Sequence, residues 1–256
     1  MAPFQGPIKT VVFFFAMEAE ATPFIQALGL IKDEPSKLPG PIPAVSFSGD
    51  YEGLKVHVVW NGKDPLFGVD NVGTVPASLT SYLAIQALHP DIVISAGTAG
   101  GFKSKTAAIG DVFLGTHVVN HDRRIPIPGF DAYGIGRQLC LPTPQLRAAL
   151  GLKEGVISSG NSLDYTDSCL KIMEAEGVAI KEMESAAIAW SCRLFVDASG
   201  TTPLPLICIK AVTDIVDGGR PTHEEFLENL STAAKSLQTT LPLVLKFIVG
   251  KALTEL

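Results

Sequence analysis

The chain has 256 residues, with 20 lysines and arginines against 26 aspartates and glutamates, so its net charge is −6. Hydrophobic residues make up 46% of the chain, which is enough to bury a large core and excludes an intrinsically disordered protein. The negative charge and the lack of a basic cluster argue against a nucleic-acid partner. No run of 18 apolar residues occurs, so we expect a cytoplasmic protein without membrane-spanning segments.

The four cysteines are Cys140, Cys169, Cys192 and Cys208. None of them forms a Cys-x-x-Cys pair, so their spacing suggests neither a zinc site nor a thioredoxin-like site. We expect reduced thiols in the core of a protein from a reducing compartment.

The N-terminal region allows two interpretations. Residues 11–17 form an apolar run after Lys9, and residues 19–21 (Ala-Glu-Ala) are similar to a signal-peptide cleavage site. Glu18 and Glu20 follow the run at once, which favours a buried first strand over residues 8–16. Residues 1–8 would then form an N-terminal tail of a single domain that spans residues 1–256.

The rest of the chain alternates between strand and helix patterns. Further strands are predicted over residues 54–60, 91–96, 112–119, 155–159, 178–180 and 206–212. Helices are predicted over residues 21–28, 74–88 (capped by Thr74), 167–176 and 183–194, and from residue 221 onward with Phe226, Leu227, Leu230, Ala233, Leu237 and Leu241 facing inward. This alternation predicts an α/β fold, a single-domain three-layer sandwich with helices on both sides of a mixed, largely parallel sheet.

Ligands in such folds gather at the carboxyl ends of the strands. Four predicted strand ends carry polar or glycine-rich clusters: residues 17–20, 97–101, 182–184 and 213–214. The sequence therefore predicts a binding site where these four segments meet.

Each cluster also has a purely structural interpretation. Glu20 is placed to activate water at a strand end, but acidic residues in a first helical turn also complement the helix dipole. The same two interpretations apply to Glu182 and Glu184, whose carboxylates suit the hydroxyls of a sugar. Asp214 follows an apolar strand and is a candidate proton donor, or a turn aspartate.

Two further segments are ambiguous. Residues 97–101 (Gly-Thr-Ala-Gly-Gly) let the backbone approach a ligand closely, or form a simple tight turn. His121 lies beside an aspartate and two arginines, and for this group a structural ion pair is favoured over a catalytic base. The long segment 120–144 is irregular, and loops of that length are usually functional or contact a partner.

Together these clusters resemble the 5'-methylthioadenosine/S-adenosylhomocysteine nucleosidases of the nucleoside phosphorylase superfamily. Four blocks carry the resemblance: residues 16–20 (Ala-Met-Glu-Ala-Glu), 95–102 (Ser-Ala-Gly-Thr-Ala-Gly-Gly-Phe), 181–187 (Lys-Glu-Met-Glu-Ser-Ala-Ala) and 210–214 (Lys-Ala-Val-Thr-Asp). Residues 73–78 and 121–128 are similar to the plant branch in particular. Leu163 and Lys210, which stand where bacterial members often have an aromatic residue and an arginine, also fit that branch.

The resemblance implies hydrolysis of the N-glycosidic bond of methylthioadenosine, and of S-adenosylhomocysteine, in methionine salvage. It makes Glu20 the base that activates water and Asp214 the acid that protonates N7 of adenine. It implies substrate binding by Thr98, Gly100, Leu163, Lys181, Glu182, Met183, Glu184 and Lys210, with no metal and no cofactor. It also implies a homodimer in which the segment around Ile125 and Phe130 contacts the partner subunit.

These roles suit the chemistry. An oxocarbenium-like sugar is stabilised by nearby carboxylates, adenine leaves only after protonation, and water needs a base. Two alternatives remain: a phosphorylase that attacks with phosphate, for which Lys63 and Lys210 would supply positive charge, and a non-catalytic storage protein of the same fold. The carboxylates at the first strand end disfavour the former, and the presence of Glu20, Glu184 and Asp214 together disfavours the latter.

Overall fold

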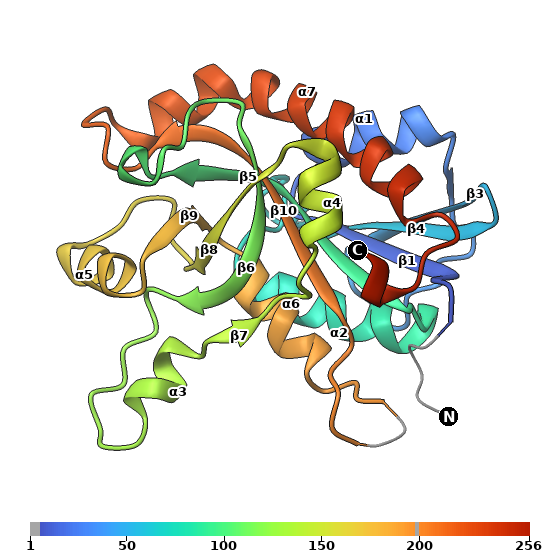
Figure 1. The fold of residues 1–256 in the computed structure, drawn as a ribbon, viewed down its shortest axis with the longest axis horizontal. Coiled ribbons are helices and arrows are strands. Elements are labelled where there is room, and N and C mark those ends of the chain that lie inside the picture. Colours follow the sequence, from blue (N-terminus) through green and yellow to red (C-terminus); the bar gives the residue numbers. More distant parts are fainter. Residues whose placement is uncertain (1–5, 198–199) are drawn as a thin grey trace.

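The computed structural model describes residues 6–197 and 200–256. Its strands are β1 (Thr10–Phe15), β2 (Ile31–Lys32), β3 (Val45–Tyr51), β4 (Leu54–Trp60), β5 (Ile92–Gly101), β6 (Val112–Asn120), β7 (Gln138–Leu139), β8 (Lys153–Ser159), β9 (Val178–Glu182) and β10 (Leu206–Ile215). Its α-helices are α1 (Glu18–Leu28), α2 (Thr74–Leu88), α3 (Asp131–Ile135), α4 (Pro144–Leu150), α5 (Asp167–Ala175), α6 (Ser185–Cys192) and α7 (Thr222–Ile248). Figure 1 shows the helices on both sides of the sheet, so the predicted fold class is confirmed.

The strands of the described chain form one mixed sheet in the order β10-β6-β8-β9-β5-β1-β4-β3-β2, and β7 pairs with β6 outside this order. The pairs β1–β4, β1–β5, β5–β10, β6–β8 and β8–β9 are parallel. Because β10 pairs with both β5 and β6, the sheet curls round so that β5, β10, β6, β8 and β9 form a closed ring. The ring brings the ends of β5, β9 and β10 together with that of β1.

Strand β1 explains how the two halves of the core are built. Its side chains alternate: Val11, Phe13 and Phe15 enter the core under α1 and α7, while Val12 and Phe14 enter the core on the side of α2 and α6. A strand buried on both faces is a continuous apolar run in sequence. The prediction of a central first strand is therefore confirmed.

One interpretation of the glycine-rich segment 97–101 predicted a simple tight turn. The structure contradicts it. Strand β5 continues to Gly101, and residues Gly97 to Gly101 pair with β10 on one side, while Gly100 and Gly101 also pair with β9 on the other. Pairing on both sides keeps the segment extended despite its glycine content. Strand β10 also runs further than predicted, so Asp214 lies within it, beside a β-bulge.

Other boundaries differ from the predictions. Helix α2 is capped at Gly73, with a φ of 97° that favours glycine, and Thr74 is its first helical residue. In α7, Leu227 is 70% exposed, so it faces solvent and not the core. The segment 120–144 contains α3, β7 and the start of α4, and strand β3 was not predicted at all.

The remaining expectations concern the termini and the thiols. All four cysteines are free and buried, as expected. Ile8, assigned to the tail, is buried and its amide donates to the carbonyl of Lys251, while residues 1–5 lie outside the described part of the chain. None of the helices in the described residues is both long and apolar enough to cross a membrane.

Candidate active site

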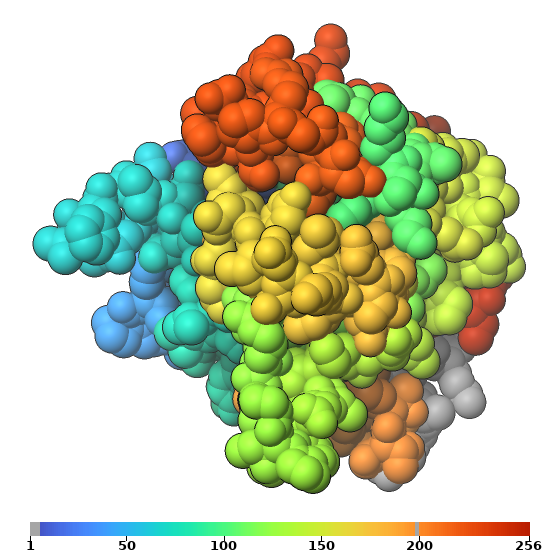
Figure 2. Space-filling model, turned by 90° about the vertical axis from the view of Figure 1, so that its left-hand side faces the viewer, coloured from blue at the N-terminus to red at the C-terminus, as the bar shows by residue number. Residues whose placement is uncertain are grey.

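A pocket of about 220 Å³ opens where β1, β5, β9 and β10 end. It is lined by Ala16, Met17, Glu20, Val72, Thr98, Ala99, Gly100, Leu163, Lys181, Glu182, Met183, Glu184, Thr213, Asp214, Thr222 and Phe226. The segments that supply Val72, Leu163 and Thr222 meet on the face of the molecule shown in Figure 2. The pocket thus unites all four clusters that the sequence singled out.

Glu20 lies in the first turn of α1 and is buried, whereas Glu18 is half exposed and pairs with Lys63 on the surface. Thr98 donates its amide (2.7 Å) and its hydroxyl (2.6 Å) to Oε1 of Glu20. The amide of Met17 donates to Oε2 at 3.3 Å. Burial raises the pKa of Glu20, and these hydrogen bonds oppose the rise. A buried carboxylate with a raised pKa suits a general base.

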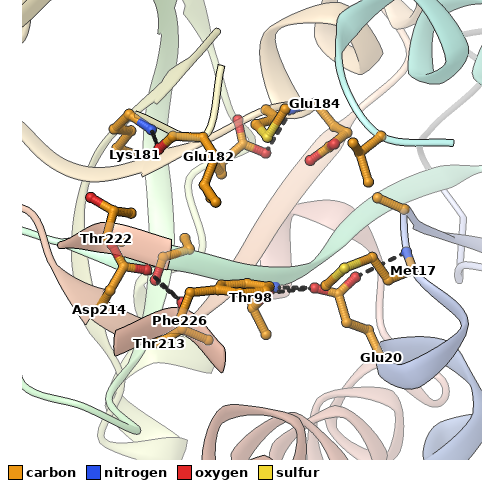
Figure 3. Close-up of a pocket in the computed structure, with 16 residues that line it drawn as sticks. Met17, Glu20, Thr98, Lys181, Glu182, Glu184, Thr213, Asp214, Thr222 and Phe226 are labelled. Carbon is orange, nitrogen blue, oxygen red and sulfur yellow. Dashed lines mark hydrogen bonds between the residues drawn. The ribbon is translucent and has the colours of Figure 1, made fainter. Parts of the chain in front are cut away.

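Asp214 lies at the opposite end of the pocket from Glu20 (Figure 3). It is 3% exposed, and burial raises the pKa of its carboxyl. The Thr213 hydroxyl donates to Oδ1 at 2.7 Å. Oδ2 faces Gly100, where a Cβ atom would lie only 2.6 Å from it. Glycine at this position therefore leaves room for the carboxyl, which can hold a proton for a leaving group.

Glu182 and Lys210 form a buried ion pair, with 3.0 Å between Oε2 and Nζ. Glu182 also accepts hydrogen bonds from the hydroxyls of Ser159 and Ser185 and from the amides of Glu184 and Ser185. Burial alone would raise the pKa of Glu182, but Lys210 and these bonds hold it below its usual value. Glu182 is therefore an ionised anchor that joins β8, β10 and the start of α6.

Glu184 immediately precedes α6 and accepts a hydrogen bond from the amide of Gly73 at 2.8 Å. Burial raises its pKa to about 7, with the negative charge of Glu182 adding to the shift. Its carboxyl points into the pocket, across from Glu20 (Figure 3). This position suits a ligand that carries hydroxyl donors.

A second, much smaller cavity lies behind the pocket. Its volume is about 10 Å³, and its lining includes Glu20, Asn61, Ser95, Glu184 and Lys210. Lys210 lines this cavity and not the main pocket, and it donates to the Ser95 hydroxyl at 3.1 Å. A polar cavity of this size is at the lower limit for a single water molecule.

The sequence alone does not predict most of the apolar part of the pocket. Val72 follows a loop that carries no recognisable pattern. The sequence around Thr222 predicts only the start of a helix. Phe226 is expected in the core, but it lines the pocket together with Thr222, one helical turn before it in α7. Ser95 and Ser159 were also missed, although a serine that interrupts or ends a buried strand is a signal for a polar network.

The cluster at residues 121–124 is not an ion pair among neighbours. His121 is buried, its Nδ1 lies 3.1 Å from the Ser158 hydroxyl, and burial lowers its pKa to about 4. Asp122 accepts from the amide of Asn161, and Arg123 donates to the carbonyl of Gly134. Asp122 therefore ties this segment to the loop after β8, and Arg123 ties it to α3.

Ile125 and Phe130 do not line the pocket. Phe130 is 49% exposed and packs edge-on against Tyr133, with 6.1 Å between ring centroids. The two residues lie on the segment that projects below the body of the molecule in Figure 1.

Comparison with known proteins identifies the family. Residues 10–248 match the phosphorylase superfamily. The chain is 45% identical over 252 residues to an Arabidopsis thaliana 5'-methylthioadenosine/S-adenosylhomocysteine nucleosidase, covering 98% of this chain and 96% of that protein. It is 46% identical over 250 residues to an Arabidopsis 5'-methylthioadenosine nucleosidase, covering 98% and 91%.

A solved structure agrees with these sequence comparisons. The apo form of Arabidopsis 5'-methylthioadenosine nucleosidase superposes with a TM-score of 0.93 at 46% identity, covering 98% of this chain and all of that one. The chain therefore belongs to the phosphorylase superfamily and, within it, to the family of the methylthioadenosine and S-adenosylhomocysteine nucleosidases.

Proposed function

We propose that the protein hydrolyses the N-glycosidic bond of 5'-methylthioadenosine and releases adenine and 5-methylthioribose, as a step of methionine salvage. The observation that carries the proposal is the pair of buried carboxyls, Glu20 and Asp214, at opposite ends of one pocket. The Arabidopsis relatives, named for this activity, support it. One of them is named for S-adenosylhomocysteine as well, so that nucleoside is the second substrate to assay.

Glu20 is the general base that activates water. Its carboxylate borders both the main pocket and the small polar cavity, so a water molecule held there would lie between Glu20 and Glu184. Water attacks weakly unless a base removes its proton as the new bond forms. Lys210 on the cavity wall helps to keep Glu20 ionised, because its positive charge lowers the pKa of that carboxyl.

Asp214 is the acid that protonates adenine at N7. Burial raises the pKa of its carboxyl, which favours the protonated form that a general acid needs, and a protonated purine leaves more readily than an anionic one. Leu163, in the loop between β8 and α5, borders the same end and packs against the base.

Glu184 binds the ribose hydroxyls, with the Met183 backbone beside it. Carboxylates accept hydrogen bonds strongly and also stabilise the positive charge that develops on the sugar. Thr98 and Gly100 of β5 form the floor between base and acid, and Glu182 holds the Glu184 amide in place. Met17, Val72 and Phe226 supply the apolar wall that a methylthio group would contact.

The phosphorylase alternative requires cations that are free to bind phosphate. Lys63 pairs with Glu18, 2.9 Å away on the surface, and Lys210 pairs with Glu182 in the interior. Both lysines that would supply positive charge are thus already matched by carboxylates. The storage-protein alternative does not explain the buried network around Glu182 and Glu184, because a non-catalytic protein does not need it.

The active form is a homodimer, located in the cytoplasm. An apolar surface supports the homodimer. On this surface Leu79 and Tyr82 of α2, Trp190 of α6, and Phe130 and Tyr133 near α3 are all at least 38% exposed. A groove between α2, α6 and α3 runs across this surface. Exposed apolar patches of this kind mark interaction sites. Ile125 and Phe130 are the contacts to the partner subunit.

The acid and base assignments are tested with Asp214→Asn and Glu20→Gln. Each keeps the shape of the side chain, and each should lower kcat for methylthioadenosine by at least about 10²-fold. Circular dichroism and the melting temperature should stay near those of the wild type. Near-normal turnover by either variant would remove that residue from its role.

A further inference from the structure

Lys181 is a buried cation in the pocket to which the proposed reaction assigns no chemical step. It is only 5% exposed, and its Nζ donates to the carbonyl of Leu163 at 2.6 Å and to that of Ser162 at 3.2 Å. A buried ammonium is tolerated only when its N–H groups are hydrogen-bonded. Both partners belong to the loop after β8, so one lysine fixes two successive peptide units next to the base.

The register of the sheet places Lys181 and Asp214 in one row. Lys181 of β9 pairs with Gly100 of β5, and Gly100 pairs with Asp214 of β10. Residues directly opposite one another in a sheet project from the same face, and neighbouring strands are about 4.8 Å apart. Gly100 has no side chain to separate the other two. Figure 3 shows Lys181 and Asp214 at the same end of the pocket.

We propose that Lys181 is a positioning residue for adenine departure, which holds the loop of residues 160–164 against the base and keeps a positive charge beside Asp214. The proposal rests on the function proposed above. Leu163 can pack against the base only while its backbone stays in place, and the Lys181 ammonium supplies the tie. The same ammonium attracts the carboxylate that Asp214 becomes after it gives up its proton.

The surrounding charges agree with this placement. Burial lowers the pKa of Lys181, while Asp214, Asp164, Glu182 and Cys169 oppose the change. Burial raises the pKa of Asp214, which Thr213 and Lys181 oppose and Glu225 of α7 reinforces. On the far side, His121 is kept neutral partly by Lys181. Among these groups, Lys181 is the cation that acts directly on Asp214.

Lys181→Met tests both parts of the proposal, because it keeps an unbranched side chain that is only one atom shorter but removes its charge and hydrogen bonds. The loop should loosen, and KM for methylthioadenosine should rise roughly tenfold. The Asp214 carboxylate would lose an attracting charge, so the pKa of Asp214 should rise. Activity that depends on the protonated acid should then persist to higher pH, by at least about half a pH unit.

Two further variants sharpen the test. Lys181→Arg keeps the charge, so its alkaline limit should stay near that of the wild type even if KM rises, and it also serves if Lys181→Met does not fold. Lys153 is a control outside the pocket: it too donates to a loop carbonyl (Thr106, 2.6 Å), and it also pairs with Asp111. Lys153→Met should change neither KM nor the pH profile.

The outcomes separate this inference from the proposed function. If wild-type protein releases adenine without phosphate and Asp214→Asn is inactive, the function stands whatever Lys181 does. In that case a Lys181→Met protein with wild-type KM, or with an unmoved alkaline limit, would overturn the role of Lys181. If Asp214→Asn remains active, the acid assignment fails first and the charge part of this inference fails with it.

Discussion

Thr98 donates both its backbone amide and its hydroxyl to the same carboxylate oxygen of Glu20, at 2.7 and 2.6 Å. Both donors come from one residue of β5, and they hold a carboxyl in the first turn of a different element, α1. Hydrogen bonds to the ionised form lower a carboxyl pKa, so Thr98 opposes the rise that burial causes. The pair therefore controls the pH range in which Glu20 is available as a base.

Thr98→Val should make the enzyme more sensitive to acid. The amide bond to Glu20 remains but the hydroxyl bond is lost, so the pKa of Glu20 rises further. A base works only when ionised, so its activity is lost as pH falls through that pKa, and the acidic limit should move to higher pH. The profile of kcat/KM against pH measures this shift, with Thr98→Ser, which keeps a hydroxyl, as the control. Identical acidic limits for the two variants would count against the role of the hydroxyl.

Gly100→Ala should damage catalysis more than folding. The new Cβ would lie 2.6 Å from Oδ2 of Asp214 and 2.8 Å from a methyl group of Val216, so both side chains must move. Misplacing the acid by about 1 Å is expected to cost roughly 10²-fold in kcat. Steady-state kinetics beside a thermal melt checks this expectation. A variant with normal kcat would show that Asp214 tolerates displacement, contrary to its assigned role.

Lys210→Met should destabilise the protein strongly. It leaves the Glu182 carboxylate buried without its cation, a change that costs about 3–5 kcal/mol when a buried pair is broken from one side. Urea unfolding at neutral pH measures the loss.

The double variant Lys210→Met/Glu182→Gln should recover much of that stability, because no uncompensated charge remains. Equal losses in the single and the double variant would mean that the ion pair is not what stabilises this region.

Phe130→Asp should weaken the proposed dimer. A charge placed in an apolar contact must be desolvated when the subunits associate. Sedimentation of the variant should reveal monomer at concentrations where the wild type is dimeric. Leu227→Asp, on an exposed apolar residue of α7 away from this surface, is the control. Unchanged sedimentation of Phe130→Asp would exclude Phe130 from the interface.

The strongly patterned parts of the fold could be predicted from sequence. The apolar run of β1 is explained by burial of both faces of the strand. The periodicity of α7 is explained by burial of one face of the helix. The extended geometry of residues 97–101 could not be predicted, because it depends on pairing with β9 and β10, which are far away in the chain. Leu227 shows a similar limit, since periodicity does not reveal which neighbours a helix end has.

The acidic residues of the site were found because they follow apolar strands, which is a local signal. The buried partners that tune them were harder to find. Ser95 and Ser159 contact the ion pair of Lys210 and Glu182 because β5 pairs with β10 and β8 pairs with β9. The row formed by Lys181, Gly100 and Asp214 likewise depends on strand register and not on sequence spacing.

The most direct test of the proposed hydrolysis is adenine release from 5'-methylthioadenosine by purified protein. It is measured first without phosphate and then with phosphate added. The roles proposed for Glu20 and Asp214 predict full activity in phosphate-free buffer, with one 5-methylthioribose formed per adenine and no stimulation by phosphate. Release only in the presence of phosphate, with a sugar phosphate as product, would contradict it and remove Glu20 from its role as base. No release of adenine in either buffer would favour the alternative of a non-catalytic protein with the same fold.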